Sequence, residues 1–311
     1  MVANYLRLSL ALELLAYASI SWWLHWLYGW GYGWLALGAV VAAFVSRFFT
    51  VCITTAIGFA ARSPRAREHW IGVKGTAAML LREWRAVLGT NFIAFPWERW
   101  VLRPDPPLAP CASLPVVMVH GYFSNRGYFR PLVRGLEALG VQPVCTPNFR
   151  SAFASIGEFA QGLHEQLESL CAATGQPQVV LVCHSMGGLA ARRYIAEHGA
   201  GRVRRLITIA SPHNGTVHAR MGSGVNAREM QRGSAFLADL AAREGAQGPG
   251  CPVTSIYTPH DNLVAPQDTS RLAWARNIAI PGRGHVDILG CERLLAIIAK
   301  ELAEAGVPVS P

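Results

Sequence analysis

The chain has 311 residues, of which 51% are hydrophobic and 15% are charged, and its formal net charge at pH 7 is +9. Typical soluble domains contain about 25% charged residues, so this composition argues against a chain that is water-exposed throughout and indicates a membrane part beside one large domain. The positive charge is almost all arginine and is not interleaved with aromatic residues, which excludes the usual nucleic-acid-binding modules.

Two long apolar runs fill the first 61 residues. Leu8 to Tyr28 contains one acid, Glu13, and Gly33 to Ala61 contains one charge, Arg47. About 20 helical residues cross a hydrocarbon core of about 30 Å, so each run is long enough to span. Tryptophan and tyrosine, which prefer the headgroup level, crowd the turn between the runs. The sequence predicts a transmembrane helical hairpin over residues 1–61, with a buried soluble hairpin as the alternative.

The flanking charges predict how this hairpin is oriented. The turn between the runs carries no charge, whereas cations stand before the first run and after the second, at Arg7, Arg62, Arg65 and Arg67. By the positive-inside rule, both ends of the hairpin and the domain that follows lie on the cytoplasmic side of the inner (cytoplasmic) membrane. Within the hairpin, Arg47 could reach the cytoplasmic interface or pair with Glu13.

Residues 62–113 are predicted to connect the hairpin to the C-terminal domain. Gly75 to Gly89 has amphipathic spacing, which fits a helix on the membrane surface and a helix packed on the folded domain equally well. Arg103 to Pro110 is rich in proline and therefore stiff. It marks the boundary before a domain at residues 114–311.

Strand-like and helix-like segments alternate through the C-terminal domain. This alternation predicts an α/β domain whose mostly parallel sheet is covered on both faces. The one long excursion, residues 214–252, either caps the site or packs as ordinary helix. The predicted strands are 115–119, 141–145, 179–183, 205–210, 253–257 and 277–280, and the helices are 128–139, 155–174, 186–198 and 290–305.

A serine stands at a sharp turn between the third predicted strand and the next helix. The apolar run Val179 to Val182 leads into Cys183-His184-Ser185-Met186-Gly187-Gly188. A strand, a tight turn with a serine at its tip and a following helix form a nucleophile elbow, in which the positions two before and two after the serine must be small. Gly187 meets this requirement, and Cys183 stands where glycine is more usual. Ser185 is the predicted nucleophile.

An acid and a histidine follow in the chain order that such a site requires. Asp261 comes after the strand 253–257, and His285 lies in a glycine-flanked loop after the strand 277–280. A serine hydroxyl needs a base to remove its proton and a third group to orient that base. We therefore assign His285 as the base and Asp261 as the acid, with Asp268 as the second choice of acid.

The first strand of the domain runs into His120-Gly121-Tyr122. A backbone amide after this His-Gly pair and the amide of the residue after the nucleophile would face the developing oxyanion. These amides belong to Tyr122 and Met186.

Together these motifs resemble bacterial α/β-hydrolase lipases and esterases over about residues 114–305. The resemblance implies the α/β-hydrolase fold and hydrolysis of carboxylic esters through a Ser-His-Asp triad and an acyl-enzyme. It matches Ser185, Asp261 and His285 to the family's triad and implies no cofactor. The similar segments are Val119–Gly121, His184–Gly188, Ile209–Thr216, Thr254–Tyr257 with Asp261, and Gly282–His285.

The expected partners are a lipid or other ester substrate and the membrane, while the oligomeric state is left open. Asp287 resembles a calcium-binding position of larger bacterial lipases, but a second acidic ligand is not evident and we expect no metal. The seven cysteines show neither a Cys-x-x-Cys pair nor zinc spacing, which fits a reducing compartment. Two alternatives stay open: a thioesterase, amidase or phospholipase on the same scaffold, and a non-catalytic membrane-bound binding module.

Overall fold

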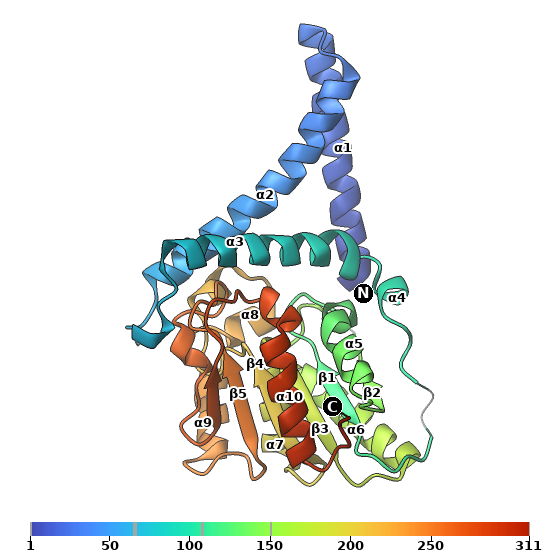
Figure 1. Cartoon of the computed structure of the whole chain (residues 1–311), viewed down its shortest axis with the longest axis vertical. Helices are drawn as coiled ribbons and strands as arrows, with labels where there is room; N and C mark the ends of the chain where they lie inside the picture. Colours follow the sequence, from blue (N-terminus) through green and yellow to red (C-terminus); the bar gives the residue numbers. More distant parts are fainter. Residues whose placement is uncertain (1, 65–66, 107–108, 150, 311) are drawn as a thin grey trace.

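The computed structural model describes residues 2–64, 67–106, 109–149 and 151–310. It consists of a helical hairpin, a long helix that crosses the base of this hairpin, and an α/β domain beneath that helix (Figure 1). The following residues of the segments named above lie outside the described residues: Met1, Arg65, Ala66, Pro107, Leu108, Arg150 and Pro311.

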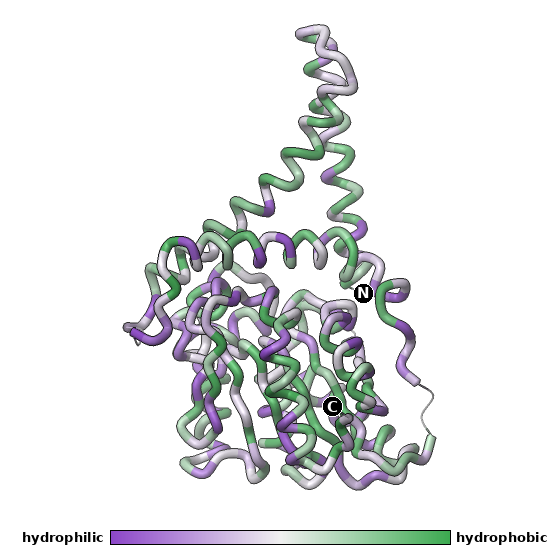
Figure 2. The backbone as a smooth tube through the Cα atoms, viewed as in Figure 1, coloured by the Kyte–Doolittle hydropathy of each residue, from purple (hydrophilic) through white to green (hydrophobic). Residues whose placement is uncertain are grey.

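The hairpin is formed by α1 (Val2–Tyr28) and α2 (Tyr32–Ala60). The two helices meet at the tip, where the chain turns at 29–31, and diverge toward the α/β domain (Figure 1). Of the two expectations for Arg47, pairing with Glu13 is the one realised: the guanidinium donates two hydrogen bonds to the carboxylate across the hairpin. Figure 2 shows hydrophobic residues predominating along both helices.

Only one helix of the described chain, Tyr32–Ala60, is long and apolar enough to cross a membrane. This α2 helix is almost entirely unburied, with 6% of its most apolar 18-residue window inside the protein, so it is not a core helix of a soluble domain. The charges of Arg7 and Glu13 make α1 less apolar. A hairpin that spans with both helices therefore stays a prediction.

The helix α3 (Gly72–Gly89) packs one face on the α/β domain. Met79 and Glu83 on this face are buried, whereas Leu81 on another face is exposed. The indole of Trp84 donates a hydrogen bond of 3.0 Å to the carbonyl of Phe44 in α2, which fixes α3 against the hairpin. Of the two alternatives for this segment, packing on the domain is what the structure has, and the exposed apolar face is left free for a membrane surface.

A short π-helical turn η2 (Thr90–Ala94) and α4 (Glu98–Val101) follow α3 and also contact the α/β domain. The side chain of Asn125 donates a hydrogen bond of 2.8 Å to the carbonyl of Phe95. A Cβ on Gly127 would lie 2.1 Å from the carbonyl oxygen of Ala94, so this close approach requires glycine. A single-turn η1 (Arg67–His69) precedes α3.

Six parallel strands form the sheet of the described residues, in the order β2-β1-β3-β4-β5-β6. The second strand is shorter than the predicted 141–145 because Pro143 has no backbone N–H to donate to a ladder. The strands are β1 (Val116–Val119), β2 (Val144–Cys145), β3 (Val179–His184), β4 (Val203–Ile209), β5 (Val253–Tyr257) and β6 (Arg276–Ala279).

Helices cover both faces of this sheet, which is why its central strands read as continuous apolar runs. Val116 and Met118 of β1 pack into one core with α5 (Arg130–Ala138) and α10 (Glu292–Glu304), whereas Val117 and Val119 pack into a second core. The second core contains α6 (Ile156–Thr174) and α7 (Met186–His198). Alternate residues of an extended strand point to opposite faces, so one strand serves both cores.

The excursion at residues 214–252 forms three short helical segments between β4 and β5. Their side chains, including Met230 and Leu240, pack with Met186 and Leu189 of α7 in a third apolar cluster. The segments are η4 (Val217–Met221), α8 (Val225–Glu229) and α9 (Ala235–Glu244); the remaining turns are η3 (Arg126–Phe129), η5 (Gln267–Ser270) and η6 (Asp287–Gly290).

Candidate active site

Ser185 sits between the end of β3 and the first residue of α7, with φ 55° and ψ −127°. This is a strained conformation for a residue other than glycine, and such strain gathers at functional sites. A Cβ on Gly187 would lie 2.3 Å from the carbonyl oxygen of Val119, so strand and helix leave no room for a side chain there. Cys183 is fully buried between them and packs as a small apolar residue.

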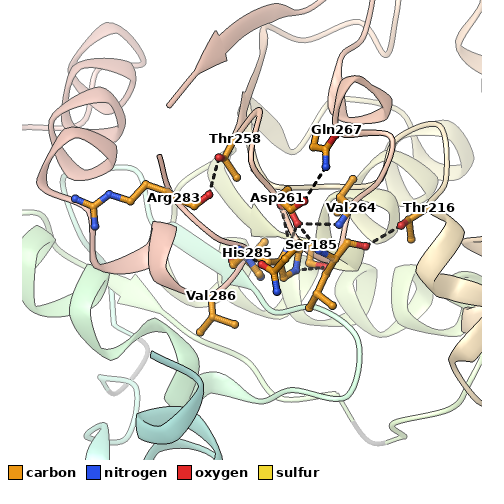
Figure 3. A network of polar contacts seen from close by, with 12 residues as sticks. Ser185, Thr216, Thr258, Asp261, Val264, Gln267, Arg283, His285 and Val286 are labelled. Atoms are coloured by element: carbon orange, nitrogen blue, oxygen red, sulfur yellow. Dashed lines mark hydrogen bonds and ion pairs between the residues drawn. The ribbon is translucent and has the colours of Figure 1, made fainter. Parts of the chain in front are cut away.

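The structure brings Asp261 and His285 to Ser185 from two separate loops (Figure 3). Asp261 follows β5, and His285 lies between β6 and η6. The Nδ1–H of His285 donates to Asp261 Oδ2 at 2.9 Å, with Oδ1 at 3.1 Å. On the other side of the ring, the hydroxyl of Ser185 donates to Nε2 at 3.1 Å. The imidazole thus bridges carboxylate and hydroxyl, and the carboxylate fixes its tautomer.

Backbone and amide groups hold the carboxylate and the imidazole in place. The amides of Leu263 and Val264 donate to Asp261 Oδ1 at 2.7 and 2.8 Å. The amide of His285 donates to the side-chain oxygen of Asn262 at 3.0 Å. Figure 3 shows this network converging on the centre of the site. Asp261 and His285 are 3% and 4% exposed, so little water competes for these hydrogen bonds.

Opposing effects act on the pKa of His285. Burial favours the neutral ring, but the charge and hydrogen bond of Asp261, and the charge of Glu83, outweigh it and raise the pKa of His285 above its ordinary value. Three nearby histidines behave differently. Burial lowers the pKa of His120 to about 4 and depresses the pKa values of His184 and His213, so these rings stay neutral at pH 7.

The turn at Gly121-Tyr122 lies directly against the serine. A Cβ on Gly121 would lie 2.8 Å from the Cβ and 3.3 Å from the Oγ of Ser185. Met186 is the first residue of α7, where helix amides and the helix dipole favour negative charge. The phenol of Tyr122 anchors its turn by donating to the carbonyl of Ser223 at 2.8 Å. The two predicted oxyanion residues are thus on either side of Ser185.

Two other acids considered in the sequence point elsewhere. Asp268 accepts a hydrogen bond of 2.9 Å from Ser63, and Asp287 pairs with Arg283 at 3.1 Å. Within the described residues, no group of three His, Cys, Asp or Glu side chains could hold a metal ion.

A cavity of ≈ 400 Å³ opens over Ser185 and His285, and its lining is mostly apolar. Its walls come from three parts of the chain. The excursion contributes residues between positions 216 and 230, such as Met221 and Met230, and a capping role for residues 214–252 stays a prediction. The helices before the domain contribute Thr50, Val51 and Thr54 of α2, Glu83 and Val87 of α3, and Thr90, Asn91 and Phe95 beyond it. The loops that follow the strands of the sheet contribute the rest, including Tyr122, Leu263 and Val264.

Sequence reasoning missed this contribution of the N-terminal helices. The carbonyl of Thr54 accepts a hydrogen bond of 3.1 Å from His218, and its hydroxyl accepts one of 3.1 Å from Asn262. The carboxylate of Glu83 accepts hydrogen bonds from the amides of the two residues that follow His285. One signal was visible: Glu83 is a lone acid on the helix face that carries Met79 and Val87.

Known proteins resemble this chain in family profile and in fold. Residues 115–293, more than half of the chain, match the family profile described as the alpha/beta hydrolase fold. No curated protein matches the chain in sequence. The mature form of Bacillus licheniformis lipase BlEst2 has a TM-score of 0.56 at 16% identity, covering 64% of this chain and 96% of that chain. Aspergillus fumigatus lipase B has a TM-score of 0.55 at 16% identity, covering 66% of this chain and 56% of that chain. The predicted α/β-hydrolase fold is confirmed.

Proposed function

The chain belongs to the α/β-hydrolase family, and on this basis we propose that it is a membrane-anchored serine hydrolase that cleaves carboxylic esters in the manner of a lipase or esterase. One observation carries the proposal: Asp261, His285 and Ser185 stand in a hydrogen-bonded row, and the row ends in an apolar cavity. Two of the compared structures with this fold are lipases, which supports an ester substrate.

The proposed reaction is a two-step acyl transfer. Nε2 of His285 accepts the proton of Ser185 while Oγ attacks the ester carbonyl, and Asp261 stabilises the imidazolium that forms. The imidazolium then gives its proton to the leaving alcohol, which leaves the acyl group on Ser185. Water then enters, loses a proton to His285 and attacks the acyl carbon. The imidazolium returns this proton to Oγ of Ser185 as the carboxylic acid leaves, which restores the free serine and the neutral ring. The raised pKa of His285 suits a ring that must hold a proton midway through each step.

The oxyanion of each tetrahedral intermediate would be bound by the amides of Tyr122 and Met186. These amides are backbone groups held by the turn at Gly121 and by the start of α7, so they need no rearrangement as charge develops. One such donor contributes about 2.7–4 kcal/mol to transition-state stabilisation. Side-chain identity at Tyr122 matters mainly through its hydrogen bond to Ser223, which fixes the turn.

Covalent labelling by a fluorophosphonate probe tests the proposal in the detergent-solubilised protein. We expect labelling at Ser185 and loss of p-nitrophenyl ester turnover by several orders of magnitude in Ser185→Ala. Ser113→Ala, at a serine remote from the cavity, is the matched control. If Ser185→Ala hydrolysed the ester at the normal rate, Ser185 would have no part in the reaction, and a folded protein that never labels would favour a binding module.

The leaving group is a separate question, because a triad acts on several acyl compounds. A panel of matched ester, thioester, amide and phospholipid substrates ranks them by kcat/KM. We expect the carboxylic ester to lead, since the cavity lining is mostly apolar and suits an acyl chain. A higher kcat/KM for any other class would replace the ester in this proposal.

The membrane anchor is supported by the exposed apolar surface of α2 and by the position of the charges. Arg7 and Arg62 lie at the end of the hairpin next to the α/β domain, while the sequence from Leu14 to Ser46 contains no Asp, Glu, Lys or Arg. The positive-inside rule then places the domain on the cytoplasmic side. Cysteine-free variants that carry Trp30→Cys at the tip or Gln247→Cys, at an exposed position of the domain, test this. An impermeant maleimide should label only the first in intact cells, and the reverse pattern would invert the topology.

A further inference from the structure

One wall of the catalytic cavity belongs to the helix that is apolar enough to cross a membrane. Val51 is 2% exposed, and it lines the cavity together with Thr50 and Thr54. Thr54 lies one helical turn after Thr50, which is exposed. Successive turns of α2 are about 5.4 Å apart along the helix axis, and α2 leaves the domain toward the hairpin tip (Figure 1). The cavity wall therefore continues outward along α2 into its exposed apolar part.

The rim of the cavity on this side is apolar. Met221, which lines the cavity, is 61% exposed. On α2 itself Phe48 and Phe49 stand next to Thr50 and are exposed. Exposed large apolar groups around the mouth of an apolar cavity mark a surface that meets lipid or an apolar ligand.

We propose that the substrate is an ester lipid that resides in the bilayer and that its acyl chain slides along α2 from the membrane into the cavity. This inference rests on the proposed ester hydrolysis and adds the substrate class and the route of entry. The cavity volume of ≈ 400 Å³ lies within the range of about 300–1,000 Å³ for small-molecule sites. A chain that passes along α2 meets the exposed side chains of Phe48 and Phe49 and avoids transfer through bulk water.

Two tryptophan substitutions on α2 test the route. Thr50→Trp adds bulk at the cavity mouth, whereas Ile53→Trp adds the same bulk at an exposed position outside the cavity lining. Each variant is reconstituted in phosphatidylcholine vesicles and assayed with a long-chain diacylglycerol in the bilayer and with p-nitrophenyl acetate in water. Val51→Trp, deeper in the same wall, is a second blocking variant.

We expect Thr50→Trp to lower the ratio of diacylglycerol turnover to p-nitrophenyl acetate turnover at least about tenfold, because obstructing an apolar pocket costs on this scale. Ile53→Trp should leave both rates unchanged. Equal loss on both substrates, or no loss with either blocking variant, would overturn the route along α2. Failure of the proposed function itself looks different: the wild-type protein would then hydrolyse neither substrate.

A second inference concerns Glu83, a buried carboxyl that the reaction above does not use. Its side chain is 1% exposed and reaches from α3 to the loop that carries His285. The amide of Val286 donates to both carboxylate oxygens at 3.1 Å, and the amide of Asp287 donates to Oε2 at 2.8 Å. Gly284 makes the approach feasible, since a Cβ there would lie 2.3 Å from Oε2.

The titratable and charged groups around this carboxyl belong to the site and to the same loop. Burial raises the pKa of Glu83 to about 7, against the two amide hydrogen bonds, which lower it. Its ionised form in turn contributes to the raised pKa of His285. The surrounding groups are His285, Asp261, Tyr128, and Asp287 with its partners Arg82 and Arg283.

We infer that Glu83 is a positioning residue, which fixes the His285 loop through its backbone so that the site is complete only when α3 is docked. The conservative variant Glu83→Gln keeps the shape of the side chain but loses the charge and one acceptor. Glu98→Gln removes another buried carboxylate of the N-terminal segment, which binds Asn148 instead, and is the matched control.

For Glu83→Gln we expect kcat on p-nitrophenyl acetate to fall about tenfold at nearly constant KM, the pattern of a weakened transition-state interaction. The acid limb of the pH profile of kcat should move to lower pH, because the charge that raised the pKa of His285 is gone. Gly284→Ala, which displaces the carboxylate and leaves α3 intact, should reproduce the loss in kcat. A lower kcat with an unmoved acid limb would reduce Glu83 to a packing role, and an unchanged kcat in both variants would remove it from the site.

Discussion

The α/β domain and the helical hairpin place their apolar residues in opposite ways. Leu163 and Leu181 in the domain are fully buried, whereas Leu15 and Trp34 in the hairpin are 63% and 76% exposed. The two regions use the same kinds of side chain, but the domain excludes water from them by packing against itself, whereas the hairpin leaves them exposed, which suits the proposed membrane anchor. Where the two regions meet, polar side chains take part in the contact, as Thr54, Asn262 and Gln267 do.

This contrast shows that the hairpin is more than an attachment. A tether would touch the domain only through a linker, but α2 and α3 contribute walls of the cavity and hold the loops that carry Asp261 and His285. A division into hairpin, connector and catalytic domain at residues 61 and 113 stays a proposal, and the candidate site itself draws on all three parts.

The largest expected effect is the loss of activity on substitution of an acid of the α/β domain. Asp261→Asn should lower kcat by about 10⁴ on any ester, since the amide no longer fixes the tautomer of His285 or stabilises its charged form. The same change removes the main cause that raises the pKa of His285. Because the ring must be neutral to accept a proton, activity is lost as pH falls through this pKa, and the acid limb of the profile should move to lower pH in the variant. A pH titration of kcat/KM measures both effects, and an unmoved acid limb would contradict the assignment of Asp261.

A matched pair of leucines tests the contrast in burial directly. Leu181→Ala removes a fully buried side chain from β3 and should destabilise the protein by about 2–5 kcal/mol. Leu15→Ala on α1 should change stability by less than about 0.5 kcal/mol in detergent, since the side chain packs mainly on solvent or lipid. Denaturant unfolding of the α/β domain, followed by tryptophan fluorescence, gives both values. Equal destabilisation would mean that α1 is a core helix.

A smaller effect than that of Leu181→Ala is expected at the junction. Thr54→Val removes the hydroxyl that accepts the hydrogen bond of Asn262 and should destabilise the docked state by about 0.5–1.5 kcal/mol. Thermal unfolding in detergent measures this change. Thr76→Val, which loses only a hydrogen bond within α3, is the control. If the two substitutions had the same effect, the contact between α2 and the Asp261 loop would contribute nothing to stability.

The sequence predicted the parts of the site that are local and could not predict those that are tertiary. Ser185, Asp261 and His285 each follow a strand of a parallel sheet, and the carboxyl ends of such strands meet at one edge, so their convergence could be expected from the strand pattern alone. Val51 and Glu83 lie more than 100 residues before the nucleophile, and their periodicity fits a membrane helix or an amphipathic helix equally well. Which surface a helix covers depends on docking, and the lone acid Glu83 on an apolar helix face is the one local sign of it noted in the sequence.

The side-chain amide of Asn262 makes a hydrogen bond through its oxygen and another through its nitrogen. Its oxygen holds the backbone of His285 and its nitrogen holds the hydroxyl of Thr54. A helix that crosses a bilayer changes its tilt when the thickness of that bilayer changes. With α2 anchored in the bilayer as proposed, such a tilt would act on the hydrogen bond between Thr54 and Asn262 and, through the other end of the Asn262 amide, on the backbone of the proposed general base.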